Sequence, residues 1–248
     1  MTNNKYAIAS AVGDASLHEL WSAGDRNFDV LLIYFGNDDE YAAKLESQVD
    51  MVLRAKGQKL HLLAQLIQEG KIDLTRYDYV WFPDDDIAMD TISINKFFEI
   101  NSRFRALISQ PAVLGYTSYW ITKHQPQFFA RATSFIEVMA PCFAREALAE
   151  CLHSFKEEES GWGVDDLWWT LLGKPRKKLL IIDAYPMIHT RPIQAVQRFP
   201  HAEKNAEALR KRYGIQRKIE ELGFLMNRGW WAPKWIAKIL TLFNGYKL

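Results

Sequence analysis

The stretch "YVWFPDDDIAMD", residues 79–90, places three consecutive aspartates directly after an aromatic and apolar run. Such a run is typical of a buried strand, and Asp84, Asp85 and Asp86 follow at its carboxyl end. Adjacent carboxylates raise one another's pKa, and a divalent cation removes this cost while using their oxygens as ligands. The alternative is an acidic helix N-terminus, where aspartate is favoured as a cap. The stretch therefore predicts a strand that ends in a cation site or in a helix cap.

Similar apolar runs alternate with helical patterns along the rest of the chain. We expect strands at 5–12, 28–35, 51–57, 77–82, 112–118, 134–143 and 177–190. We expect helices at 59–71, 92–107, 145–155 and 165–172. This alternation predicts an α/β fold, with a mixed, mostly parallel sheet and flanking helices on both faces.

The composition excludes several classes of protein. The 248 residues are 48% hydrophobic, which is enough for a substantial core, and the formal net charge is +1. No global positive field steers the chain to nucleic acid, so we expect no nucleic-acid partner. Two cysteines are too few for a disulfide framework, and no paired CxxC spacing of structural zinc is present. No apolar window reaches the length of a membrane span, and we expect a cytoplasmic protein.

A second polar segment, "ESGWGVDDLWW" (159–169), surrounds a tryptophan with glycines. Gly161 and Gly163 let the backbone approach a ligand, and Trp162 between them offers a stacking face for a sugar ring or a base. The carboxylates of Asp165 and Asp166 follow at once, and one of them can act as a general base. The alternative is a turn that packs on the core, with Asp165 as a helix cap.

His189 ends the last predicted strand, in "YPMIHTRP". A single histidine is more often structural or on the surface. At a strand end of the same sheet, however, its imidazole can complete a metal site with one of the three aspartates.

These segments, in this order, resemble the GT-A class of nucleotide-sugar glycosyltransferases over roughly residues 5–195. The DxD motif of that class follows a hydrophobic strand, as Asp84-Asp85-Asp86 does, and a GWG-x-(Glu/Asp)-Asp segment follows downstream, as residues 161–166 do. The whole layout is similar to an uncharacterised glycosyltransferase-like family, a domain of unknown function, that shares a Lys-Gly-x-Lys turn, here residues 56–59.

The resemblance implies a role for each matching residue. Asp86 and His189 would hold Mn²⁺ or Mg²⁺ on the donor diphosphate, with Asp84 facing the ribose or the sugar. The metal would neutralise charge on the leaving nucleoside diphosphate. The remaining donor-binding residues would be Asp85, Gly13, Asp14 and Lys56. On the acceptor side, Asp166 matches the base of inverting enzymes, Asp165 the acceptor-holding carboxylate, and Trp162, Gly161 and Gly163 the stacking platform. Because the family has Glu where this chain has Asp165, the choice of base between Asp165 and Asp166 stays open.

The composition changes near residue 200, where basic residues begin to outnumber acidic ones. We therefore expect a GT-A-like catalytic domain at 1–200 and a basic, aromatic, helical extension at 201–248. Its segment "WWAPKWIAKILTLF" (230–243) is amphipathic and can lie in a membrane interface, which would place the protein peripherally at the inner face of the membrane. The alternative, which we favour, is a helix whose apolar stripe packs on the domain or on a second copy.

The leading hypothesis is a metal-dependent glycosyltransferase of polysaccharide biosynthesis. It would transfer a sugar from a nucleotide-diphosphate donor, a UDP-sugar in the first place, to a glycan or lipid-linked acceptor of the kind that bacteria use, with inversion. One alternative is a non-catalytic member of the same fold that binds a sugar or a nucleotide. A metal-dependent phosphohydrolase is the weaker alternative, because it would need further His and Asp ligands for a two-metal site.

Overall fold

One mixed sheet organises the chain in the computed structural model, which describes residues 4–193, 199–226 and 231–232. Among these residues the sheet has 11 strands in the order β11-β10-β7-β9-β6-β8-β4-β1-β2-β3, and β5 pairs with β9 beside this path. The strands are β1 (Tyr6–Val12), β2 (Phe28–Tyr34), β3 (Met51–Arg54), β4 (Tyr79–Trp81), β5 (Ile87–Ala88), β6 (Ile108–Gly115), β7 (Ala130–Thr133), β8 (Cys142–Ala144), β9 (Leu179–His189), β10 (Glu221–Leu225) and β11 (Trp231–Ala232). The longest ladders, β1 with β2 and β6 with β9, are parallel.

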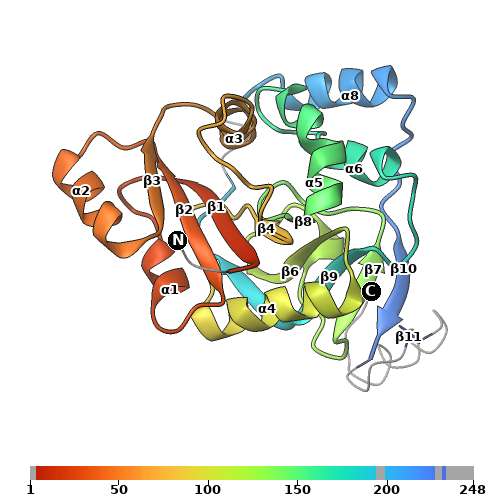
Figure 1. Ribbon diagram of the computed structural model, residues 1–248. Coiled ribbons are helices and arrows are strands. Elements are labelled where there is room, and N and C mark those ends of the chain that lie inside the picture. Colours follow the sequence, from red (N-terminus) through yellow and green to blue (C-terminus); the bar gives the residue numbers. More distant parts are fainter. Residues whose placement is uncertain (1–3, 194–198, 227–230, 233–248) are drawn as a thin grey trace.

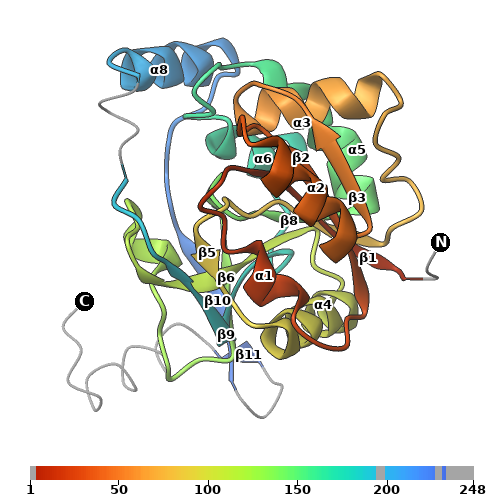
Figure 2. The same cartoon turned by 90° about the vertical axis from the view of Figure 1, so that its left-hand side faces the viewer.

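Helices cover both faces of this sheet. They are α1 (His18–Ser22), α2 (Asp39–Gln48), α3 (Lys59–Gln68), α4 (Thr91–Phe104), α5 (Arg145–Cys151), α6 (Asp165–Leu171) and α8 (Ala202–Arg212), with short 3₁₀ turns η1 (Trp120–Thr122) and η2 (Leu152–Lys156). Helix α4 runs along one face, while α3, α5 and α6 lie on the opposite side (Figure 1). The view turned by 90° shows the same layers and places α8 outside α6 (Figure 2). The predicted α/β class with flanking helices is confirmed.

The parallel half of the sheet follows from its sequence. All seven residues of β2 are buried, and six of the seven in β1 are, so these strands are continuous apolar runs instead of alternating ones. Helix α4 begins at a side-chain cap, because the Asp90 carboxylate accepts a hydrogen bond from the amide of Ser93 at 2.9 Å. These local signals explain why the sequence places most elements correctly.

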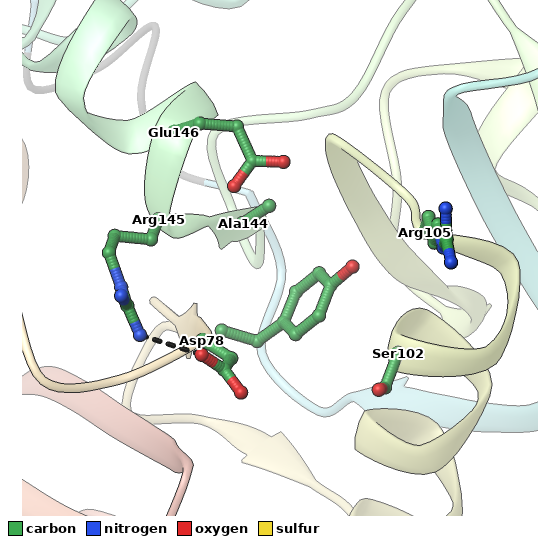
Figure 3. Close-up of a pocket in the computed structure, with 7 residues that line it drawn as sticks. Asp78, Ser102, Arg105, Ala144, Arg145 and Glu146 are labelled. Carbon is green, nitrogen blue, oxygen red and sulfur yellow. Dashed lines mark hydrogen bonds and ion pairs between the residues drawn. The ribbon is translucent and has the colours of Figure 1, made fainter.

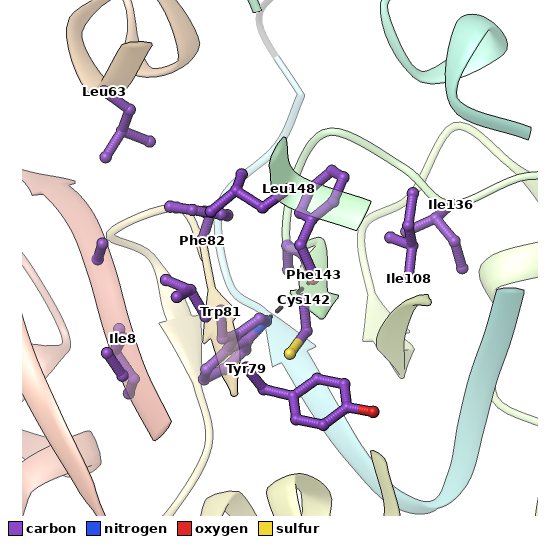
Figure 4. Close-up of a cluster of buried hydrophobic side chains, with 14 of the residues drawn as sticks. Ile8, Leu63, Tyr79, Trp81, Phe82, Ile108, Ile136, Cys142, Phe143 and Leu148 are labelled. Carbon is purple, nitrogen blue, oxygen red and sulfur yellow. Dashed lines mark hydrogen bonds between the residues drawn. The ribbon is translucent and has the colours of Figure 1, made fainter. Parts of the chain in front are cut away.

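An aromatic cluster fixes the carboxyl end of β4 (Figure 4). The Trp81 indole donates a hydrogen bond to the carbonyl of Ala140 at 2.9 Å. The Phe143 ring on β8 contacts Phe82 at 6.0 Å and Trp168 of α6 at 5.0 Å, measured between ring centroids. The Phe143 ring of β8 thus packs between Phe82, at the end of β4, and α6, where the chain delivers the three aspartates.

Two predicted strands are wrong in their bounds. The region predicted as a strand at 134–143 is mostly a loop between β7 and β8, because the backbone around Glu137 leaves the sheet to bind side chains from other elements. Strand β6 begins three residues before Pro111 instead of at it. The proline is tolerated because the ladder with β9 shifts register between Pro111 and Val113, where no amide hydrogen is required.

The segment after residue 200 joins the main sheet. Helix α8 agrees with the predicted helical extension, while Glu221–Leu225 forms β10, which pairs with β7. Most of the amphipathic segment 230–243 lies outside the described residues, and so does any contact it makes with a membrane. Of the helices in the described ranges, none has the length and apolar character needed to cross a membrane. Both cysteines are free and buried.

A buried ion pair joins three strands far from the aspartates. The guanidinium of Arg131 on β7 binds both oxygens of Asp183 on β9, at 2.9 and 3.1 Å, and neither side chain is exposed. It also donates to the carbonyls of Ile121 and Lys123, both at 2.7 Å, and contacts Glu221 of β10 at 3.2 Å. All polar atoms of the guanidinium thus have partners inside the protein, which offsets the desolvation of the charges.

Arg131→Met should lower the free energy of unfolding by roughly 3–5 kcal/mol, because Asp183 would stay buried without its cation. Urea unfolding of the purified chain measures this loss. Lys96→Met is the matched control, since it breaks an ion pair with Glu99 whose side chains are about half exposed; we expect a change of less than about 1 kcal/mol. Equal losses in the two variants would contradict the structural role of the buried pair.

Candidate functional site

The three aspartates lie at the carboxyl end of β4, in the turn between β4 and β5. Strand β4 pairs in parallel with β1, so the turn after β1 lies beside them. Ser10 of β1 donates a hydrogen bond to the carbonyl of Pro83 at 2.8 Å, and the amide of Leu17 donates to the carbonyl of Asp85 at 2.8 Å. The chain thus presents the aspartates at the edge where open α/β sheets bind ligands.

Each aspartate has a different partner. The Asp84 carboxylate accepts from the Lys59 ammonium at 2.5 Å. The Asp85 carboxylate accepts from the amide of Gly13 at 2.9 Å and from the Arg191 guanidinium at 3.1 Å. The Asp86 carboxylate faces the His189 imidazole. Separate partners turn the carboxylates away from one another, which reduces the repulsion inherent in the sequence.

Asp86 and His189 form the candidate metal pair. Oδ2 of Asp86 lies 3.2 Å from Nε2 of His189, and each residue is only 7% exposed. Burial alone favours the neutral forms, but their mutual attraction outweighs it: the pKa of Asp86 falls below its ordinary value and the pKa of His189 rises above its own. The other ring nitrogen, Nδ1, contacts the carbonyl of Tyr116 at 2.6 Å, so Nδ1 carries a proton there and Nε2 is the atom directed at Asp86.

This pair suits a divalent cation that also binds phosphate. Carboxylate oxygens suit both Mn²⁺ and Mg²⁺, whereas imidazole suits transition metals and therefore favours Mn²⁺ of the two. Mg²⁺ sites usually combine one or two carboxylates with phosphate oxygens and water. Within the described residues, no group of three or more His, Cys, Asp or Glu side chains comes together as a metal cage. The protein would therefore supply two ligands, and a phosphorylated ligand the others.

The two lysines of the Lys-Gly-x-Lys turn, Lys56 and Lys59, contact different parts of the structure. The ammonium of Lys56, which the resemblance places at the donor, donates to the carbonyls of Phe35 and Gly36 and to Asn37 on an exposed loop. Lys59 instead reaches into the site. Besides Asp84, its ammonium contacts the carbonyls of Val138 and Met139, at 2.7 and 2.9 Å. Sequence reasoning noted the turn but did not assign Lys59 a role.

Gly13 and Asp14, which the resemblance places near the nucleotide base, each have a protein partner: the Gly13 amide donates to Asp85, and Asp14 contacts Tyr34. A Cβ on Gly13 would lie 2.9 Å from the Phe35 ring, so glycine is needed for this close approach. The Asp14 carboxylate accepts a hydrogen bond from the Tyr34 hydroxyl. Their role at the nucleotide base stays a prediction.

Asp165 and Asp166, the candidate bases, begin helix α6 and differ in their surroundings. Both oxygens of Asp166 are bound by guanidinium groups, Arg210 at 3.0 Å and Arg217 at 3.1 Å. Asp165 is 2% exposed; Oδ2 accepts from the amide of Val138 at 3.4 Å, and Oδ1 has no partner among the described residues. Burial, and then the neighbouring charge of Asp166, raise the pKa of Asp165 well above its ordinary value.

The two candidate halves meet at the segment 137–139. Val138 and Met139 contact Lys59 through their carbonyls, and the amide of Val138 contacts Asp165. The next residue back, Glu137, is 5% exposed and was not predicted as a site residue. A charged residue inside the apolar run "SFIEVMAP" was the available signal.

The glycines around Trp162 have a packing role in this structure. Both adopt positive φ, +78° at Gly161 and +82° at Gly163, which favours glycine in this turn. A Cβ at Gly163 would lie 2.8 Å from the Cβ of Ala206, so the close neighbour at this glycine is helix α8. Trp162 itself is half-buried. An acceptor platform here stays a prediction.

A polar cavity of about 320 Å³ lies at the other end of β4 (Figure 3). Asp78, which lines it, directly precedes the strand, whereas Asp84–Asp86 follow it. Its most prominent contact is the ion pair between Arg145 and Asp78 at 2.6 Å. The cavity is thus separate from the candidate site.

Comparisons with known proteins place the fold. No family model matches the chain, and no curated protein matches it in sequence. Among solved structures, S. aureus TarS 1-349 has a TM-score of 0.53 at 10% identity, covering 75% of this chain and 60% of that one. The same fragment in complex with UDP-GlcNAc also has a TM-score of 0.53 at 10% identity, covering 75% and 58%. GalNAc-T7 with UDP, GalNAc and Mn²⁺ has a TM-score of 0.55 at 12% identity, covering 77% and 44%.

The chain has a GT-A-type fold. This confirms the fold that the DxD segment and the strand pattern predicted. The chain spans about three fifths of the TarS fragment, and at these identities the likeness concerns the fold alone.

Lys59→Met should destabilise the site end of the sheet. The substitution keeps most of the side-chain volume but removes the donor that Asp84 and the carbonyls of Phe82, Val138 and Met139 share. We expect a loss of roughly 1–3 kcal/mol in the free energy of unfolding. Lys56→Met is the matched control three residues away; its ammonium contacts an exposed loop, and a change within about 0.5 kcal/mol is expected. Chemical denaturation of both variants measures the difference. A control that loses as much stability as Lys59→Met would contradict a special role for Lys59.

Proposed function

We propose that the chain is a metal-dependent glycosyltransferase that transfers a sugar from a UDP-sugar to a glycan or lipid-linked acceptor, with inversion. The observation that carries this proposal is the Asp86–His189 pair at the carboxyl ends of β4 and β9, in a GT-A-type fold. The solved structures with UDP-GlcNAc, and with UDP, GalNAc and Mn²⁺, support the choice of donor and metal.

The donor half of the site would use the three aspartates differently. Asp86 and His189 would hold Mn²⁺ or Mg²⁺, and the bound ion would neutralise charge on the leaving UDP. Asp84, oriented by Lys59, would accept hydrogen bonds from hydroxyl groups of the ribose or the sugar. Asp85 would act indirectly, because it holds the turn at Gly13 and the side chain of Arg191.

The acceptor half would supply the proton acceptor. In an inverting transfer, the acceptor hydroxyl attacks the anomeric carbon, the bond from that carbon to the UDP oxygen breaks, and the hydroxyl proton passes to a base. Asp166 is neutralised by two guanidinium groups, whereas Asp165 keeps an unpaired oxygen. We therefore assign the proton to Asp165, whose raised pKa makes its carboxylate a stronger base once it is ionised. Because Asp165 is buried, an acceptor hydroxyl reaches it only when the side chains that cover it move aside.

A thermal-shift panel tests the donor and the metal together. UDP, GDP, CMP and ADP are each measured with and without Mn²⁺. We expect UDP with Mn²⁺ to raise the Tm of the wild type by on the order of 5 °C at about 100 times Kd. Asp86→Ala and His189→Ala should lose the Mn²⁺-dependent part, while Asp39→Ala, whose side chain is 85% exposed, should keep it.

Turnover tests the transferase proposal itself. Release of free sugar from UDP-sugars, followed by mass spectrometry, should fall at least about 100-fold in Asp86→Ala. Unchanged release in that variant would overturn the role of Asp86. If the wild type binds UDP with Mn²⁺ but neither releases nor transfers sugar from any UDP-sugar, the chain is the non-catalytic binding member of the fold instead.

A further inference from the structure

Glu137 is a buried carboxyl group without a cation partner among the described residues. Its Oε2 accepts a hydrogen bond from the Thr117 hydroxyl at 3.2 Å and lies 3.4 Å from the Thr122 hydroxyl oxygen, and the backbone amide of Glu137 donates to the side-chain oxygen of Gln110 at 2.7 Å. Burial, partly opposed by the Thr117 hydrogen bond, raises the pKa of Glu137 to about 7. Burying a carboxyl group without a cation lowers the stability of the fold. Packing alone therefore does not explain why a glutamate stands at this position.

Both hydroxyls belong to the same loop, residues 116–122, which we call the bridging loop. Thr117 and Thr122 also contact each other, with 2.7 Å between their hydroxyl oxygens. The Thr122 hydroxyl lies 2.9 Å from the carbonyl of Tyr119, and the amide of Tyr119 donates to the Thr117 hydroxyl at 3.1 Å. Glu137 therefore sits at the centre of the hydrogen bonds that close this loop.

The first residue of the bridging loop holds His189. The carbonyl of Tyr116 contacts Nδ1 of His189 at 2.6 Å, and the amide of Tyr116 donates to the His189 carbonyl at 3.3 Å. Gly115, just before it, has a φ of +92°, and a Cβ there would lie 2.5 Å from the same His189 carbonyl. Tyr116 of the bridging loop is thus hydrogen-bonded to both the backbone and the ring of His189, the candidate metal ligand.

The middle of the bridging loop contacts the other half of the site. The Tyr119 ring packs on Phe135 at 4.5 Å, and the guanidinium of Arg217 lies 5.1 Å from the centre of the Tyr119 ring. Arg217 in turn binds Asp166. A change in the position of this loop would therefore reach both His189 and Asp166.

We propose that Glu137 is a positioning residue that sets the orientation of His189 for a divalent cation, acting through Thr117, Thr122 and the carbonyl of Tyr116. The proposal rests on the metal site of the proposed function. A carbonyl that accepts a hydrogen bond from Nδ1–H keeps the proton on Nδ1 and the lone pair of the neutral ring on Nε2, the atom that faces Asp86. Without Glu137 the loop loses the acceptor at its centre, the Tyr116 carbonyl is no longer fixed, and His189 binds the cation less well.

The experiment measures Mn²⁺ affinity instead of turnover. Free Mn²⁺ is titrated by electron paramagnetic resonance in the presence of UDP, using the full chain. Glu137→Ala should weaken Mn²⁺ binding roughly 10-fold or more, as changes to the partner of a metal-bound histidine generally do. Glu137→Gln should stay close to the wild type, because its amide oxygen accepts the same hydrogen bond from the Thr117 hydroxyl. The double variant Thr117→Val with Thr122→Val should weaken Mn²⁺ binding to the same extent as Glu137→Ala. It replaces Glu137→Ala in the experiment if Glu137→Ala does not fold.

Asp29→Asn is the control for a merely structural effect. Asp29 is 1% exposed and binds Arg76 and the Tyr77 hydroxyl near the amino ends of β1 and β4, so its replacement lowers stability away from the loop. We expect this control to bind Mn²⁺ as the wild type does.

Three outcomes would overturn the proposal. In the first, folded Glu137→Ala or the double valine variant binds Mn²⁺ as the wild type does. In the second, Asp29→Asn weakens Mn²⁺ binding as much as Glu137→Ala does. Either result means that Glu137 has no positioning role, although the metal site itself stands. If the wild type binds no Mn²⁺ with UDP, the metal site of the proposed function fails together with this inference.

Discussion

Three adjacent carboxylates after β4 impose the constraint that the rest of the site satisfies. Side chains that repel one another in sequence must be turned apart, and each needs its own donor. The donors come from distant parts of the chain: Lys59 from α3, Gly13 from the turn after β1, and His189 from β9. The end of β4 is thus the place where α3, β9 and the turn after β1 each supply a partner to one aspartate. Of the three aspartates, Asp86 is the one that faces a histidine, whose neutral imidazole can bind a metal ion. The proposed metal site therefore rests on Asp86 and His189.

The second half of the site has the opposite electrostatics. Within the part of the chain that the structure describes, Asp165 and Glu137 are buried and form no ion pair, while Asp166 binds Arg210 and Arg217. Both arginines lie after residue 200, and the strand that follows them pairs with β7. The region expected as a separate basic extension thus supplies charge to the candidate catalytic domain. Its excess of basic residues is explained in part by this local neutralisation.

The sequence predicted those features that depend on periodicity and chain order. Buried strands such as β2 appear as continuous apolar runs, and the carboxyl ends of β4 and β9 bring Asp86 and His189 together because both strands run in the same sheet. It could not predict which lysine of the Lys-Gly-x-Lys turn points inward, because that depends on the first turn of α3. It also misplaced a strand over Glu137, since an apolar run can form a buried loop whose polar backbone binds other side chains.

The buried carboxyl groups of Glu137 and Asp165 lower the stability of the fold, because neither forms an ion pair with a described residue. At Arg131 and Asp183 the fold pairs two buried charges completely, so the chain is able to satisfy a buried carboxylate where packing alone is at stake. At the site it leaves one oxygen of Asp165 without a donor and surrounds Glu137 only with hydroxyls. The acceptor hydroxyl of a transfer reaction is a donor of the kind that Asp165 lacks. In the proposed function this hydroxyl would pair with the free oxygen of Asp165, an oxygen that the requirements of folding alone do not explain.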